Sequence, residues 1–157
     1  MANIYSFDTK SLDFETVEKP AFHLHLRGRI VVVGGNSGTG KTLLCNRVTE
    51  LQTLGKTSSK VPNNGNIRVF TQDNAVSDLA AIKTLRDMLI IIDEADILLA
   101  GSPDIVEFIN SDCKKNHYLV FSRGLIDLRV TPNYCAELAE TDRVVTLKYA
   151  TDYAGWY

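Results

Sequence analysis

The chain has 157 residues, of which 45% are hydrophobic and 23% are charged. This length provides one globular domain with a sizeable core and excludes two nucleotide-binding domains. The formal net charge of −2 gives no overall attraction to nucleic acid or to acidic membranes, so net charge supports neither partner, and a local basic patch for nucleic acid stays open as an alternative.

The cysteines and the hydropathy pattern indicate a cytoplasmic protein. Cys45, Cys113 and Cys135 are far apart and form no C-x-x-C pair, which predicts free thiols in a reducing compartment. No apolar run approaches the length that spans a bilayer. We therefore expect neither a signal peptide nor membrane insertion.

The first 28 residues are expected to form a small β element that packs on a single domain covering residues 1–157. Two strand-like pieces, Ile4–Phe7 and Phe22–Leu26, are interrupted near Pro20. Five apolar, β-rich runs follow, and such continuous runs suit strands buried on both faces of a parallel sheet. These runs are Ile30–Val33, Ile67–Phe70, Leu89–Ile92, Tyr118–Phe121 and Val144–Leu147.

A phosphate-loop (Walker A) motif follows the first of these runs. Residues 35–42, GNSGTGKT, satisfy the pattern G-x-x-x-x-G-K-[ST]. Glycines allow successive N–H groups to surround a phosphate, and the helix expected from Lys41 adds the positive end of its dipole. Lys41 is expected to reach the β and γ phosphates, and the Thr42 hydroxyl to bind Mg²⁺. The expected nucleotide-binding residues are Gly35, Asn36, Ser37, Gly38, Thr39, Gly40, Lys41, Thr42 and Leu43.

Helices are predicted between the strands. Leu44, Val48 and Leu51 lie on one face of the helix that follows the phosphate loop. The stretch 75–87 is also expected to be helical, whereas residues 55–66 form a loop.

Two later helices carry start signals. Ser102 with Pro103, and Thr131 with Pro132, each match an N-cap followed by proline at the first helical position. The second of these helices is expected to include Cys135, Leu138 and Ala139.

An acidic pair follows the third β-rich run, and this arrangement is the Walker B pattern. Asp93 is expected at the carboxyl end of its strand, where α/β sheets place ligands, and would hold Mg²⁺. Glu94 would orient or deprotonate the water that attacks the γ-phosphate. The alternative is a solvated acidic turn at the end of a core strand.

Arg123 follows the strand expected beside the phosphate-loop strand. Its side chain would reach the γ-phosphate and stabilise transition-state charge. The alternatives are an arginine that caps the strand end or pairs with Asp127, with Ser122 as the polar sensor instead.

Together the two motifs resemble P-loop ATPases whose Walker B ends in Asp-Glu and whose sheet has an additional strand between the two motifs. The order of features is most similar to a reduced ATP-binding-cassette-like or AAA-like ATPase domain. The resemblance covers about residues 22–149 and includes Leu24-x-Leu26-Arg27-Gly28 before the first strand and Asp142–Leu147 as the closing strand. It places Gln72 at the position of a glutamine that senses Mg²⁺ and the attacking water. The chain has no L-S-G-G-Q motif, and Ser122 and Arg123 stand where a cassette has its switch histidine.

The resemblance implies a three-layer α/β fold with a five-stranded, mainly parallel sheet in the order 5-1-4-3-2. It also implies an ATP·Mg²⁺-binding ATPase that releases ADP and phosphate, coupled to a protein partner or a homo-oligomer. Two alternatives stay open: a nucleotide-dependent binding module with negligible turnover, and a small-molecule P-loop kinase. Residues 93–96 spell DEAD, but helicases of that type need two domains.

Overall fold

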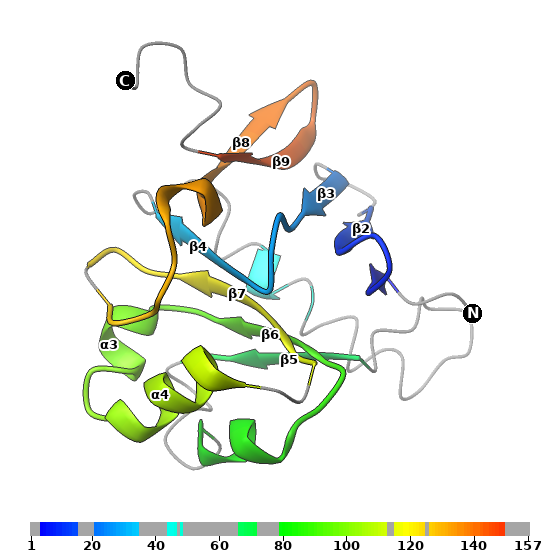
Figure 1. Ribbon diagram of the computed structural model, residues 1–157. Coiled ribbons are helices and arrows are strands. Elements are labelled where there is room, and N and C mark those ends of the chain that lie inside the picture. Colours follow the sequence, from blue (N-terminus) through cyan, green and yellow to red (C-terminus); the bar gives the residue numbers. More distant parts are fainter. Residues whose placement is uncertain are drawn as a thin grey trace.

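The structure is a computed structural model in which the described strands form one mixed sheet of nine (Figure 1). The described residues are 4–15, 21–34, 44–46, 48, 66–71, 79–112, 115–124 and 126–149. The strand order is β1-β2-β3-β9-β8-β4-β7-β6-β5. The strands are β1 (Tyr5–Ser6), β2 (Ser11–Phe14), β3 (Ala21–His25), β4 (Ile30–Gly34), β5 (Ile67–Phe70), β6 (Leu89–Ile92), β7 (His117–Phe121), β8 (Cys135–Thr141) and β9 (Val144–Tyr149).

The described helical segments are short. They comprise two α-helices, α3 (Ala95–Leu98) and α4 (Pro103–Ser111), and two 3₁₀ helices, η1 (Leu79–Thr84) and η2 (Pro132–Tyr134). Residues 44–46 and Val48 are also helical, and Leu44 and Val48 are buried. The expected helix at 75–87 is therefore a 3₁₀ helix over its described part, and the expected loop at 55–66 lies outside the described residues except for Asn66.

Strands β4, β7, β6 and β5 pair in parallel. All four residues of β6 are buried, because core residues cover the sheet here on both sides. One cluster joins residues from all nine strands to Leu44, Cys45 and Val48. The other packs the opposite face of the parallel strands against η1, α3 and α4. Burial on both faces explains why these strands are continuous apolar runs.

The expected five-stranded, mainly parallel three-layer fold is wrong. Three N-terminal strands extend the same sheet, because β3 pairs in parallel with β9. The neighbour of β4 on the other side from β7 is β8, not the strand Val144–Leu147. That last strand lies within β9, which is antiparallel to β8. The described part of the chain therefore forms a mixed sheet with few helices, whereas strands and helices were expected to alternate.

The helix expected after Thr131 is also wrong beyond its first turn. Residues 132–134 form η2, in which the Tyr134 N–H donates to the Thr131 carbonyl at 2.9 Å. The chain then becomes β8, where Ala136 and Leu138 are buried and the residues between and beyond them are more exposed. This alternation buries one face of a strand, so tertiary pairing overrides the helix propensity of Ala, Glu and Leu.

The start of α4 confirms the helix predicted from Ser102 and Pro103. Ser102 is the N-cap, Pro103 occupies the first turn, and Ile105 and Ile109 are buried. The Ser102 carbonyl accepts from the N–H groups of Ile105 and Val106 at 3.0 and 3.2 Å. Its side chain makes no capping hydrogen bond, so the signal acts here through proline and the apolar period.

The sheet curls until its two edges approach each other, which makes it nearly barrel-shaped. The Asn66 side-chain amide, just before β5, donates to the Tyr5 carbonyl of β1 at 3.0 Å. The Tyr5 hydroxyl lies 2.6 Å from Nδ1 of His117, the first residue of β7. These two contacts join the edge strand β1 to the parallel strands at their amino-terminal ends.

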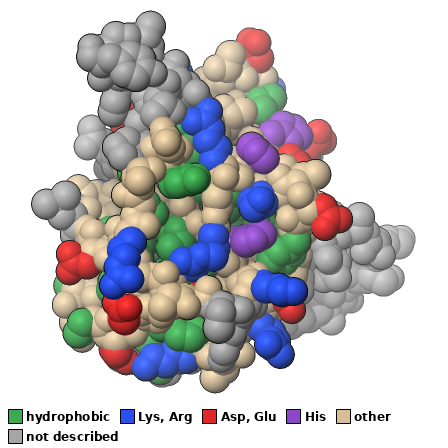
Figure 2. Space-filling model, in the orientation of Figure 1, with side chains coloured by type: hydrophobic (Ala, Val, Ile, Leu, Met, Phe, Trp, Pro, Cys, Tyr) green, Lys and Arg blue, Asp and Glu red, His purple; other side chains and the backbone are tan. Residues whose placement is uncertain are grey.

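Charged side chains of the two signs are unevenly placed on the surface. Figure 2 shows Lys, Arg and His side chains in the middle and right of one face, and Lys and Arg side chains also at its left and lower margins, where most Asp and Glu side chains lie. Ile97 and Tyr134, at 56% and 36% exposure, are the exposed large hydrophobic residues of the described part. Within the described ranges, no helix has the length and apolar character needed to cross a membrane.

Candidate functional site

The candidate site lies at the carboxyl ends of the parallel strands. Gly34 ends β4, Asp93 follows β6, and Ser122 follows β7, which lies between them in the sheet. The pairing of Val33 with Phe121 and of Ile92 with Val120 holds these ends level. The segment of the chain that follows β4 therefore starts at the same sheet edge as Asp93 and Glu94.

Asp93 and Glu94 form a tight turn at the end of β6. The Asp93 N–H donates to the Phe70 carbonyl of β5 at 2.9 Å, which continues the ladder by one residue. The Glu94 N–H donates to Oδ1 of Asp93 at 3.0 Å. Glu94 has φ 50° and ψ 48° and is the N-cap of α3. Both side chains are partly exposed, so both carboxylates are accessible to a ligand or to water.

The loop after β7 packs against the start of α3. Ser122 is buried, its N–H donates to the Val33 carbonyl at 3.0 Å, and its hydroxyl donates to the Gly124 carbonyl at 2.8 Å. The Arg123 N–H contacts Oδ1 of Asp96 at 3.4 Å. The Ser122 hydroxyl thus stabilises its own turn, and Asp96 positions the Arg123 backbone.

Arg123 itself is exposed. No ion pair of its guanidinium with Asp127 is found among the described residues; Asp127 instead accepts from the Asn110 side chain through its carbonyl at 3.0 Å. The structure therefore brings Arg123 to the same edge as Asp93 and Glu94 and anchors it by its backbone.

The remaining predicted site residues lie outside the described residues. They are Gly35, Asn36, Ser37, Gly38, Thr39, Gly40, Lys41, Thr42, Leu43 and Gln72. The residues on both sides of the motif are described: β4 ends at Gly34, and the helical residues begin at Leu44. The motif is thus flanked by a strand and by helical residues, as its pattern requires.

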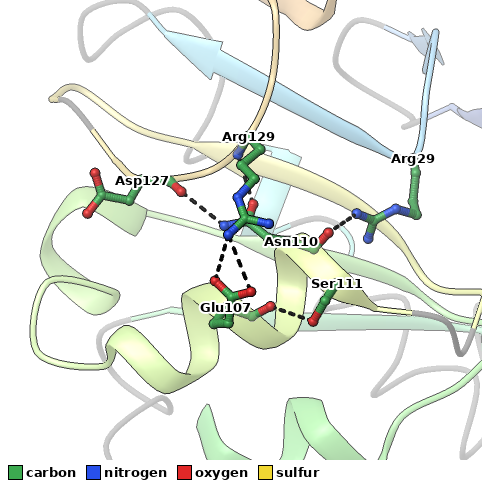
Figure 3. A network of polar contacts seen from close by, with 6 residues as sticks. All are labelled: Arg29, Glu107, Asn110, Ser111, Asp127 and Arg129. Atoms are coloured by element: carbon green, nitrogen blue, oxygen red, sulfur yellow. Dashed lines mark hydrogen bonds and ion pairs between the residues drawn. The ribbon is translucent and has the colours of Figure 1, made fainter.

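A hollow that the sequence did not indicate lies on the helical side of this edge. It has a volume of about 460 Å³ and includes Asp96, Glu107 and Arg129 in its lining. Figure 3 shows its polar contacts: Arg129 pairs with Glu107 at 3.0 Å, and the Arg129 N–H donates to the Asn110 side-chain oxygen at 2.8 Å. Its lining comes from residues 96–100, from α4 and from residues 126–129, so no local sequence pattern could have indicated it.

Metal binding within the described ranges would have to rely on few protein ligands. No group of three or more His, Cys, Asp and Glu side chains is placed to hold a metal there. Asp93 and Glu94 provide carboxylate oxygens at one edge, and oxygen is the ligand that Mg²⁺ prefers. Mg²⁺ commonly uses one or two carboxylates together with waters and substrate phosphates.

Comparison with known proteins gives no relative. No protein-family model, no curated protein and no solved structure matches the chain significantly.

Proposed function

We propose that the chain binds ATP·Mg²⁺ and hydrolyses it to ADP and phosphate. One observation carries the proposal: the phosphate-loop motif begins where β4 ends, at the same sheet edge as Asp93 and Glu94. Two sequence motifs separated by about fifty residues thus begin at one edge. That juxtaposition is what a shared phosphate and metal site requires.

The proposed roles follow from position. Lys41 and the backbone of residues 35–42 would bind the phosphates, and Thr42 and Asp93 would hold Mg²⁺. Gln72, which follows β5 by two residues, would contact the metal or the attacking water. Glu94 would act as the base for that water, and Arg123 would stabilise charge on the transferred phosphoryl group.

Single-turnover hydrolysis of ATP labelled at the γ-phosphate tests the proposal. Glu94→Gln keeps the size and hydrogen bonding of the side chain but removes the base. It should bind ATP normally and lose about 100-fold or more in rate. Lys41→Ala should weaken ATP binding by at least about tenfold, or about 1.4 kcal/mol, in calorimetry.

Glu15→Gln is the matched control because it makes the same substitution at an exposed position outside the candidate site. Glu15 follows β2, and in the strand order β2 lies on the other side of β4 from β6. This control should hydrolyse ATP at the wild-type rate. Unchanged ATP affinity in folded Lys41→Ala would overturn the phosphate-loop assignment. Wild-type hydrolysis in Glu94→Gln would remove Glu94 from the mechanism.

A further inference from the structure

Several basic side chains gather at the sheet edge opposite the candidate site. Strands β4 and β7 begin at this edge and β3 ends there. We call the group at this edge the basic face and define it by five residues: Lys10, His25, Arg27, Arg29 and Lys115. Arg27 and Arg29 lie between β3 and β4, and Lys115 lies two residues before β7.

Backbone and side-chain contacts hold the basic face together. The Lys10 carbonyl accepts from the Leu26 N–H at 2.8 Å, which places the turn after β1 beside the end of β3. The Tyr149 hydroxyl donates to the His25 carbonyl at 2.6 Å and accepts from the Arg27 N–H at 2.9 Å. The Arg27 guanidinium also stacks 4.2 Å from the centre of the Tyr149 ring. These contacts hold the backbones of Lys10, His25 and Arg27 close to one another, and the Tyr149 ring positions the Arg27 side chain.

Arg29 links this group to the end of α4. Its guanidinium donates to the Ile109 carbonyl at 2.8 Å. It also donates to the Asn110 carbonyl at 3.1 Å (Figure 3). A cation at the carboxyl end of a helix is stabilised by the helix dipole. Arg29 is therefore held in place while its charge still acts at this edge.

Cations from separate segments act at this edge, although the chain carries a net charge of −2 and the exposed Asp8 lies in the same turn as Lys10. Burial lowers the pKa of His117 most, and the charges of Lys10 and Arg29 lower it further. Two cations from separate segments thus act on one imidazole. Figure 2 shows Lys, Arg and His side chains in the middle of this face, and further Lys and Arg side chains near the acidic ones toward its left and lower margins.

An aromatic ring accompanies these cations. Arg29, Arg129 and Tyr134 are among the residues that line a hollow of about 220 Å³. Tyr134 packs on Gly28, where an added Cβ would lie 2.7 Å from the Tyr134 ring, yet it keeps 36% of its surface exposed. Cations beside an exposed aromatic ring suit phosphates next to bases that stack.

We propose that the basic face binds the phosphate backbone of a nucleic acid. A polyanion is favoured because the cations come from several segments and surround an edge rather than a single pocket. A membrane is disfavoured, because the only described large hydrophobic residue exposed there is Tyr134; Ile97 follows the acidic pair at the other edge. Binding at this edge is independent of the proposed ATP site.

The test is fluorescence anisotropy with labelled single-stranded and duplex oligonucleotides in a KCl series. Lys10→Glu with Lys115→Glu reverses two cations of the basic face. The control, Lys83→Glu with Arg143→Glu, changes the net charge equally, from −2 to −6. Lys83 pairs with Asp104 near the start of α4, and Arg143 lies in the β8–β9 turn at the other edge. The Lys10→Gln with Lys115→Gln variant replaces the test variant if charge reversal prevents folding.

Wild type should bind at 50 mM KCl with an affinity that falls as salt rises. The test variant should bind at least about tenfold more weakly, with a salt slope shallower by about 1.4 for a single strand. The control should stay within about threefold of wild type. Saturating ATP·Mg²⁺ should not displace the oligonucleotide, and Lys41→Ala should still bind it.

Four results would overturn the proposal. The first is that wild type does not bind either oligonucleotide at 50 mM KCl, and the second is that the test and control variants lose oligonucleotide affinity equally. The third is that ATP·Mg²⁺ displaces the oligonucleotide. The fourth is that wild type binds phosphatidylserine-containing vesicles more tightly than either oligonucleotide. None of these results bears on hydrolysis, so the two proposals fail separately.

Discussion

Glu94 combines an expected chemical role with an unfavourable backbone conformation. Its φ of 50° and ψ of 48° lie in the left-handed region, which costs a residue with a Cβ about 1–2 kcal/mol. Such conformations concentrate at functional sites, where the surrounding structure holds them. Here Glu94 is held on both sides: the Asp93 N–H before it bonds the Phe70 carbonyl, and α3 begins directly after it.

This conformation predicts that Glu94→Gly stabilises the chain. Glycine adopts the left-handed region without the Cβ cost, although it loses more backbone entropy on folding. We expect the free energy of unfolding in urea to rise by about 0.5–1 kcal/mol, while ATP hydrolysis is lost. Glu94→Ala is the matched control, since it removes the carboxylate but retains the Cβ. An equal gain in Glu94→Ala would attribute the effect to charge instead.

At the scale of elements, the β8–β9 hairpin shows how a turn fixes a strand. Asp142 and Arg143, at φ 51° and 64°, connect Thr141 to Val144, which pair directly. Two consecutive left-handed residues form a type I′ turn, whose twist matches that of the strands. The Arg143 carbonyl also accepts from the Ala21 N–H at 2.9 Å. The turn therefore sets the register of β8 and adjoins the start of β3.

Replacing Arg143 by glycine should strengthen this hairpin. Type I′ turns favour glycine at the second central position, and the carbonyl that accepts from Ala21 stays in place. We expect the free energy of unfolding to rise by about 0.5–1 kcal/mol, measured by urea denaturation. Arg143→Ala removes the same charge but retains the Cβ, and should show no gain. A gain of the same size in Arg143→Ala would exclude backbone conformation as the cause.

At the scale of the whole molecule, His117 joins β7 to the edge strand β1 and makes the stability of the fold depend on pH. Its imidazole bonds the Tyr5 hydroxyl and lies 4.7 Å from the Phe7 ring, measured between ring centres. Burial, then the charges of Lys10 and Arg29, lower its pKa below the ordinary 6.5. The folded state therefore binds fewer protons than the unfolded state just below pH 6.5.

Stability should consequently fall as the pH drops through 6.5 toward the folded-state pKa of His117. A single group contributes a slope of at most about 1.4 kcal/mol per pH unit. Urea denaturation of wild type and His117→Gln between pH 8 and pH 5 measures this slope, which should be smaller in the variant. Tyr5→Phe should lower stability across the range but keep the slope, because the imidazole stays buried. An unchanged slope in His117→Gln would assign the pH dependence to other groups.

Local patterns predicted some elements correctly where burial is uniform, or where a start signal precedes residues that are buried at the helical period. The run at Leu89–Ile92 is a strand buried throughout, and Pro103 begins a helix whose buried residues follow the helical period. The helix predicted after Thr131 and Pro132, with Cys135, Leu138 and Ala139 in it, is wrong although it carries the same start signal as Ser102 and Pro103. The pairing of residues 135–141 with β4 and β9 decided the strand instead.

The candidate site divides in the same way. The identities and order of Lys41, Thr42, Asp93 and Glu94 follow from the sequence alone, and their roles stay predictions. Their sheet could not be inferred, because the parallel pairing of β3 with β9 and the insertion of β8 beside β4 join segments far apart in the chain.

The basic face shows most clearly what only tertiary structure decided. Net charge in the sequence is an average, and it gave no support to a polyanion partner. Lys10, Arg29 and Lys115 lie at one sheet edge only because the sheet curls and because β7 begins beside β4. Sequence patterns determine which residues can form a strand or bind a phosphate, since those properties are local. Which distant charges share a surface depends on chain pairing, and pairing depends on packing across the whole molecule.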